Sequence, residues 1–310
     1  MYIGNAWLRR AARGRRVAVS ALVLCALFFL LGEARGAEPD APQGPAPLLT
    51  LLFTGNTEGQ FRPCAVCGGT AHGGLDRRST VLAQVRAQGG GRVLAVAGGY
   101  EFTPFRAELP GADVARALAQ AYAHMGYDLG LLSARDFDWL RGAGANPGPA
   151  WLPPAPEPRV RRLDAGGLRV GVVVLPAGQG LHAPAAPEAV EAVLRAAREL
   201  RPEVDLLVGL GSWGWQADKA LLDASEVPFD VLLSSGAGRG TGVRPVAGGR
   251  VLEVRPEYQG WSVIRLDILA LPQAGPDAAW TEGVHYRARV LKLDATVPGD
   301  AKVSSILGWM

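Results

Sequence analysis

The chain has 310 residues, 48% of them hydrophobic, and this suits one folded α/β domain with a large core. Its formal net charge of +3 comes from the N-terminal segment. Residues 1–36 hold six arginines and one glutamate, a net +5, so residues 37–310 carry a net charge of −2. Nucleic-acid binding needs a basic stripe, and a weakly acidic body without one leads us to expect no nucleic-acid partner.

Residues 1–36 have the pattern of a secretory signal peptide. Five arginines between positions 9 and 16 precede an apolar run, Val17 to Leu31, of about 15 residues, which is short for a membrane span. Small residues at Ala34 and Gly36 predict cleavage near Gly36 or Ala37. We therefore expect export to the periplasm or the cell surface. The alternative is a retained leader that anchors the chain to the membrane.

Residues 37–47 contain four prolines and are expected to be a linker, which leaves 48–310 as a single domain. Apolar runs and turn residues predict strands over 48–53, 92–96, 128–132, 159–163, 169–175, 205–210, 230–233, 250–254, 262–268 and 286–293, the last at a sheet edge. Helical spacing predicts helices over 75–85, 112–125 and 187–200, with a loop over 142–158.

Strands and helices alternate through the first two-thirds of this pattern, and strands dominate afterwards. That order favours a layered α/β domain. In such domains the loops at the carboxyl ends of the strands form the ligand crevice, so the residues that follow each predicted strand are the candidates for function.

Two motifs carry a resemblance to a known family. The segment 51–59 reads Leu-Leu-Phe-Thr-Gly-Asn-Thr-Glu-Gly, and Gly73-Gly74-Leu75 is followed by Asp-Arg-Arg-Ser-Thr. Together they resemble the opening of the 5′-nucleotidase and UDP-sugar hydrolase family of calcineurin-like metallophosphoesterases. Weaker likenesses to the family's strand ends follow in the same order at 93–102, 127–138, 205–214, 229–238 and 259–268. The resemblance implies a four-layer α-β-β-α sandwich.

The family binds two divalent metals, and most of the positions that the resemblance aligns with its ligands carry other residues here. An expected Asp and His of the first motif are Asn56 and Glu58, and the bridging Asp is Tyr100. The other aligned positions are Ala134, Arg135, Ser212, Gly236 and Gly238. The resemblance therefore implies a phosphoesterase with little or no hydrolytic activity and no expected cofactor.

Two alternatives for this crevice stay open. Asn56, Glu58 and Asp136 could supply oxygens to one divalent metal and support an atypical phosphohydrolase. Arg135, with open backbone N–H groups at Ser212 and at the glycines 236, 238 and 240, could instead bind a small anion in a metal-free pocket. Against this, Arg135 could form only a surface ion pair with Asp136 or Asp138.

Cys64 and Cys67 are the only cysteines beyond the leader, and they lie between the first strand and the Gly73-Gly74 helix start. A structural disulfide, a redox-active pair and a metal site with His72 are all compatible with this spacing. The surroundings also resemble UDP-sugar-hydrolase-like bacterial proteins, some with selenocysteine in a comparable motif. The leading functional hypothesis is therefore a non-hydrolytic relative of the family, with a thiol-redox role at Cys64 and Cys67 that would involve a thiol-disulfide partner.

Trp213 and Trp215 follow the strand over 205–210 and could stack on a base or sugar, although aromatic residues there more often pack into loops. We expect no nucleoside-recognition domain after Asp300, where larger nucleotidases continue. A plain interaction module is the third functional class that the sequence leaves open.

Overall fold

The computed structural model describes residues 45–64, 71–104, 107–178, 182–224, 226–273, 275 and 278–308. The expected signal peptide, residues 37–44 of the expected linker, and Cys67 lie outside these described residues. Residues Pro47–Met310 form one compact unit. None of the helices in the described ranges combines the length and the apolar character that crossing a membrane requires.

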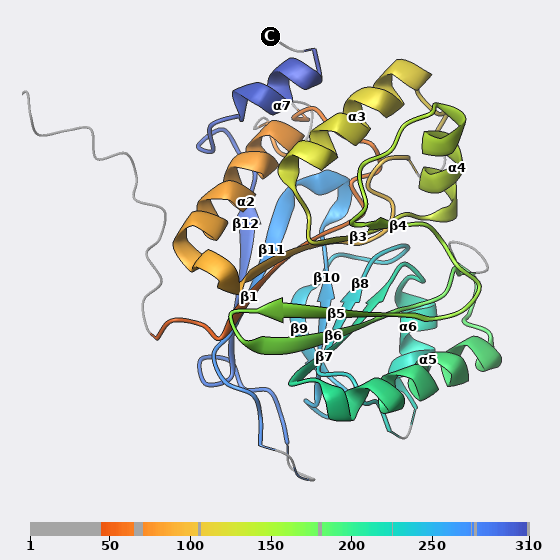
Figure 1. Ribbon diagram of the computed structural model, residues 1–310, viewed down its shortest axis with the longest axis vertical. Helices are drawn as coiled ribbons and strands as arrows, with labels where there is room; N and C mark the ends of the chain where they lie inside the picture. The colour runs from red at the N-terminus through yellow and green to blue at the C-terminus, as the bar shows by residue number, and fades with distance from the viewer. Residues whose placement is uncertain are drawn as a thin grey trace, which may run out of the picture. The chain divides into compact units, whose positions relative to one another are not determined.

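Within the described residues this unit contains twelve strands and six α-helices, which alternate mainly in its first half (Figure 1). The strands are β1 (Leu49–Thr54), β2 (Val93–Ala97), β3 (Leu129–Leu131), β4 (Trp151–Leu152), β5 (Arg159–Ala165), β6 (Leu168–Val174), β7 (Leu206–Gly211), β8 (Val231–Ser234), β9 (Gly242–Val246), β10 (Val251–Arg255), β11 (Ser262–Ile268) and β12 (Tyr286–Lys292). The helices are α2 (Leu75–Gly89), α3 (Ala112–Met125), α4 (Ala134–Gly142), α5 (Pro187–Leu200), α6 (Trp215–Leu222) and α7 (Ala301–Ile306).

The strands form two six-stranded sheets, ordered β12-β11-β1-β2-β3-β4 and β5-β6-β7-β8-β10-β9. In the first sheet β1 to β4 are parallel and β11 and β12 run antiparallel to their neighbours. In the second, β6, β7, β8 and β10 are parallel between the antiparallel strands β5 and β9. The parallel strands of both sheets end in the loops of the expected crevice.

The side-chain alternation of a strand explains the layers. On β1, Leu49, Leu51 and Phe53 join an apolar cluster shared with the second sheet, whereas Leu52 joins a cluster with the helices. Helices α2, α3, α4 and α7 cover the outer face of the first sheet, and α5 and α6 cover the second (Figure 1). The result is the expected α-β-β-α sandwich, with every β1 residue buried.

The structure corrects several local expectations. Helices α4, α6 and α7 and strand β9 were not expected, and the predicted loop over 142–158 contains the two-residue strand β4. Helix α4 begins with a capping box, in which Ser133 and Asp136 bond each other's backbone N–H. Asp300 caps helix α7, and its side chain accepts the N–H groups of Lys302 and Val303. The expected edge position of β12 is confirmed.

Candidate functional site at the strand ends

The loops after β1, β2, β7 and β8 meet at the carboxyl edge of both sheets. They bring together Asn56, Gly99, Ser212, Ser235 and Gly236, which are far apart in sequence. These are the strand ends at which the sequence predicted the ligand crevice, and the contacts there are direct bonds between the two sheets.

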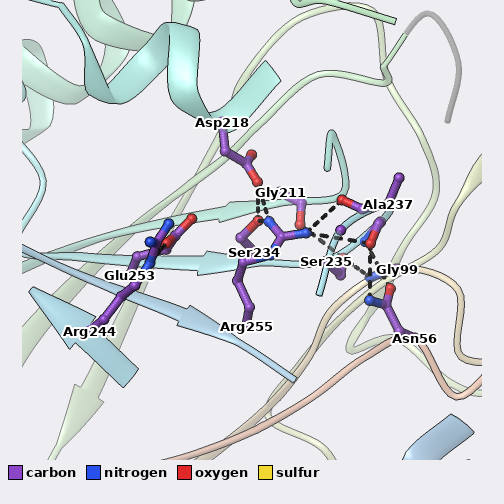
Figure 2. A network of polar contacts seen from close by, with 12 residues as sticks. Asn56, Gly99, Gly211, Asp218, Ser234, Ser235, Ala237, Arg244, Glu253 and Arg255 are labelled. Carbon is purple, nitrogen blue, oxygen red and sulfur yellow. Dashed lines mark hydrogen bonds and ion pairs between the residues drawn. The ribbon is translucent and has the colours of Figure 1, made fainter. Parts of the chain in front are cut away.

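The amide of Asn56 forms a ring of two hydrogen bonds with the backbone of Gly236, called here the Asn56–Gly236 ring. Its Nδ2 donates to the Gly236 carbonyl over 3.0 Å, and its Oδ1 accepts the Gly236 N–H over 2.8 Å (Figure 2). Asn56 is only 2% exposed. The amide of Asn56 thus satisfies both the N–H and the carbonyl of Gly236, and it links the two sheets. Buried backbone groups need such partners.

Ser235 makes a second link between the sheets. Its hydroxyl accepts the Gly99 N–H over 2.9 Å and donates to the Gly211 carbonyl over 3.0 Å. The missing side chains of Gly98 and Gly99 permit this contact, since a Cβ on either would lie 2.8 Å from Ser235 Oγ or Ser212 Cβ. Small residues therefore let the strand ends close on each other.

Unusual backbone geometry gathers around these links. Asn56, Glu58, Tyr100 and Gln259 all have positive φ, between 52° and 63°, and only one other non-glycine residue of the described ranges, Ala247, shares it. Hydrogen bonds hold them together: Gln259 donates its N–H to the Asn56 carbonyl, and Glu58 donates to Tyr100. Such conformations persist where the surroundings enforce them, and they concentrate at functional sites.

Asp136 is fully buried, and its carboxylate is occupied by protein donors. It accepts hydrogen bonds from the Tyr100 N–H, from the Thr103 N–H and hydroxyl, and from the Ser133 N–H, at 2.7–3.2 Å. Burial raises its pKa, and these bonds counteract that rise. Asp136 thus anchors the loop after β2 to the start of α4.

Ala134 and Arg135 begin α4. Ala134 is exposed, and Arg135 donates through Nη2 to the Ala107 carbonyl over 2.7 Å. The expected surface pair of Arg135 with Asp136 or Asp138 is wrong, because Asp136 serves the backbone and Asp138 pairs with Arg141.

The glycine-rich loop after β8 turns carbonyl groups toward cationic and hydroxyl donors. Arg255 Nη2 donates to the Ala237 carbonyl over 2.8 Å, and Tyr258 Oη donates to the Gly238 carbonyl over 2.6 Å. The Gly236 N–H is taken by Asn56. The Gly236 N–H is therefore not available for the anion-binding nest that the sequence suggested.

A buried ion pair under this loop was not expected from the sequence. Arg255 Nη1 donates to Asp218 Oδ2 over 2.6 Å, and the Ser234 hydroxyl bonds the same oxygen (Figure 2). Asp218 and Ser234 are 0% exposed and Arg255 is 2% exposed. Burial raises the pKa of Asp218 to about 7, and Arg255 and Ser234 oppose that rise.

A second buried network lies beside the crevice, around Glu101. This carboxylate accepts hydrogen bonds from Arg78 Nη1, Thr54 Oγ1 and Tyr122 Oη at 2.5–2.9 Å, and from the Thr57 hydroxyl. Arg78 and Glu101 are 1% and 0% exposed. The sequence signals for this pair were the place of Glu101 in the loop after β2 and the place of Arg78 in the Arg77-Arg78 motif.

Cys64 lies beside the start of α2. Its backbone pairs with that of His72 in an antiparallel bridge, with N···O distances of 2.8 and 3.3 Å, and the residue is half-buried. His72 precedes the first residue of α2, Leu75, by three positions. Cys67 lies outside the described residues, so the pairing of the two cysteines stays a prediction.

The two tryptophans after β7 differ. Trp213 is 3% exposed and donates through Nε1 to the Pro176 carbonyl over 2.6 Å, which makes it a packing residue. Trp215 is 49% exposed and begins α6. Of the two, only Trp215 presents a ring that a ligand could reach.

The comparisons with known proteins support the fold. No protein-family model matches the chain, and no curated protein matches it. Among solved structures, a 5′-nucleotidase precursor from Thermus thermophilus has a TM-score of 0.61 at 19% identity, with 84% of this chain and 57% of that one covered. The sulfate thiohydrolase SoxB of the same organism has a TM-score of 0.65 at 17% identity, with 86% and 61% covered. The calcineurin-like phosphoesterase YfkN of Bacillus subtilis has 0.55 at 14%, with 85% and 96% covered.

The chain therefore has the calcineurin-like phosphoesterase fold, and it spans about three-fifths of the first two of these structures. Within the described ranges, no three or more side chains of His, Cys, Asp and Glu come together in a way that could hold a metal ion. The Asn56 oxygen and the Asp136 carboxylate, two of the three candidate ligands, already accept protein N–H groups.

Proposed function

We propose that the chain is an exported protein of the calcineurin-like phosphoesterase fold that has lost the two-metal centre and does not hydrolyse phosphoesters. The Asn56–Gly236 ring is the observation that supports this. Asn56 stands where the resemblance expects a metal-binding Asp, and its oxygen accepts a buried N–H over 2.8 Å. A metal at that oxygen would have to break the ring and leave buried backbone groups unpaired.

Metal content tests this proposal directly. The purified protein, produced with manganese and zinc in the medium, is expected to carry no stoichiometric metal and to show no metal-dependent turnover of nucleotides or UDP-sugars. Two metals per chain would overturn the proposal. One metal that is lost in Glu58→Ala, and retained in the surface control Glu203→Ala, would favour the atypical one-metal hydrolase instead.

The positive activity that we propose is thiol–disulfide exchange at Cys64 and Cys67. Support comes from their Cys-x-x-Cys spacing and from the backbone pairing of Cys64 with His72, three positions before α2, since a helix N-terminus favours a nearby thiolate. In the reaction, one cysteine thiolate attacks a partner disulfide and releases a partner thiolate. The second cysteine then resolves the mixed disulfide, so the pair is oxidised and the partner is reduced.

The reduction potential separates this role from a structural disulfide. Redox equilibration with glutathione and dithiothreitol is expected to give a potential of about −120 to −270 mV, the range of exchange proteins, and Cys67→Ser is expected to abolish exchange. A potential below about −300 mV would instead identify a structural disulfide. Stoichiometric zinc that is lost in Cys64→Ser and in His72→Ala would instead identify a metal site formed by the two cysteines and His72.

We propose export through the leader over residues 1–36. Amino-terminal sequencing of the secreted form is expected to begin at Gly36 or Ala37, and an intact leader in the membrane fraction would show a retained anchor. A protein that binds a partner unchanged after both Cys67→Ser and Glu58→Ala would be an interaction module, with neither exchange nor hydrolysis.

A further inference from the structure

A hollow of about 370 Å³ lies on the outer face of the second sheet, between α6 and the β9–β10 hairpin. Its apolar wall comes from Leu222, Val246 and Ala247, which also pack against the core beneath α5 and α6. The volume is within the range of small-molecule pockets, and an apolar wall with a few polar groups is their usual lining.

Trp215 forms one side of this hollow as a fixed and exposed platform. Its backbone N–H donates to the Ala237 carbonyl over 2.8 Å, and its side chain packs on Gly238, where a Cβ would lie 2.7 Å from Trp215 Cδ1. The residue nevertheless remains 49% exposed. An indole held in place by its neighbours can stack on a flat ring at little cost in side-chain entropy.

The charged wall is the Arg244–Glu253 pair, two residues directly opposite each other on β9 and β10 (Figure 2). The Glu253 side chain is 2% exposed and accepts a bond from Arg244 Nε. The Arg244 side chain is 53% exposed, and within the described ranges its two terminal nitrogens have no protein partner. The buried carboxylate therefore orients the guanidinium through one edge and leaves the Nη1–Nη2 edge for a ligand.

The arrangement favours an anion over a cation. The buried carboxylate of Glu253 already has a cationic partner, so a ligand cation would have to displace Arg244. The rim carboxylate of Asp223 is likewise paired, with Lys219. A planar carboxylate, by contrast, can accept two parallel bonds from the open edge of Arg244 without breaking any contact.

We propose that this hollow binds a small aromatic carboxylate, with its ring on Trp215 and its carboxylate on the open edge of Arg244. The hollow itself lies on the helix-covered face of the second sheet, and it meets the strand-end loops only where Trp215 packs on Gly238.

Isothermal titration calorimetry of the purified protein with 2-naphthoate and its uncharged amide, 2-naphthamide, tests the proposal. We expect naphthoate to bind at least about tenfold more tightly than naphthamide, a difference of about 1.4 kcal/mol. Arg244→Gln and Trp215→Ala are each expected to weaken naphthoate binding by about tenfold. Arg162→Gln is the matched control, because Arg162 is also an edge-strand arginine, 59% exposed and paired with Glu203.

Arg244→Lys keeps the charge next to Glu253 and removes the planar fork, so it replaces Arg244→Gln if that variant does not fold. It is expected to weaken naphthoate binding by at least about threefold. Equal binding of naphthoate and naphthamide, unchanged affinity in the Arg244 variants, or no binding of naphthoate would each overturn the proposal. Preferential binding of 2-naphthylmethylamine would do the same, because it would show a cation site on Glu253.

Discussion

The side chain of Asn56 and the backbone of Gly236, 180 positions apart, bond each other twice and so join the end of β1 to the end of β8. Asn56→Ala removes both bonds and leaves a buried N–H and a buried carbonyl unpaired. It also places alanine at a φ of 52°. We expect a loss of about 3–5 kcal/mol in the free energy of unfolding, measured by urea denaturation.

Asn146→Ala is the control for this change. Asn146 also bonds a backbone N–H, that of Gly148 over 2.8 Å, but in an exposed turn. We expect it to cost less than about 1 kcal/mol. Equal losses for the two variants would contradict a structural role for the Asn56–Gly236 ring.

Asp218 makes stability depend on pH in a specific direction. Burial raises its pKa in the folded state to about 7, whereas its ordinary value is 3.8. Between these values the folded chain holds a proton that the unfolded chain has released. The contribution to stability is therefore complete below pH 3.8 and is lost as the pH rises through 7.

Asp218→Asn removes the titrating carboxyl group, so the free energy of unfolding of this variant should depend less on pH. For the natural chain, one such proton changes the free energy of unfolding by at most about 1.4 kcal/mol per pH unit. Burial also raises the pKa of Asp136 and Asp230. Those groups remain in the variant, so the difference between two urea series from pH 4 to 8 isolates Asp218, and parallel profiles would contradict the prediction.

Within the described residues Glu101 is the only ion-pair partner of Arg78, and both side chains are at most 1% exposed. Glu101→Gln leaves a buried guanidinium without its counter-charge, so we expect a loss of about 3–5 kcal/mol. Glu203→Gln, which breaks the exposed pair with Arg162, is expected to cost less than about 1 kcal/mol. Thermal and urea denaturation measure both, and a similar cost for the two would contradict the role of burial.

Trp213 and Trp215 should respond differently to substitution. Trp213→Phe loses the Nε1 bond to the Pro176 carbonyl and part of a buried ring, and we expect it to lower the free energy of unfolding by about 1–2 kcal/mol. Trp215→Ala removes a half-exposed ring that packs on Gly238, and we expect a smaller loss, below about 1 kcal/mol. Calorimetric melting temperatures provide the comparison, and a reversed order would contradict it.

The sequence predicted the fold well where periodicity is strong. The helix over Ala112–Met125 and the strand over Ser262–Ile268 have the predicted bounds, because their apolar residues follow a single period. Helix α4 was not predicted, although Ser133 and Asp136 have capping-box spacing, because its nine residues follow directly on a short strand. Helix α6 has eight residues, too few for a clear pattern.

The contacts of the crevice were harder to predict than its position. The resemblance identified Asn56 and Gly236 as positions that aligned with lost ligands, but no local pattern shows that two such residues bond each other. Arg255 and Asp218 are 37 positions apart, and the chain is so rich in arginine that a single one carries little information. Pairing over such separations follows from the sheet order, which the sequence alone did not predict.

The edges of the two sheets suggest one role for the many arginines of this chain. Within the described ranges, β4 is a two-residue edge strand and β9 contains Pro245, which has no N–H to donate. The other two edges, β5 and β12, carry five arginines between them, at 159, 161, 162, 287 and 289. Short length, proline and like charge each oppose the addition of another strand. The edge strands of both sheets are in this way protected against edge-to-edge aggregation.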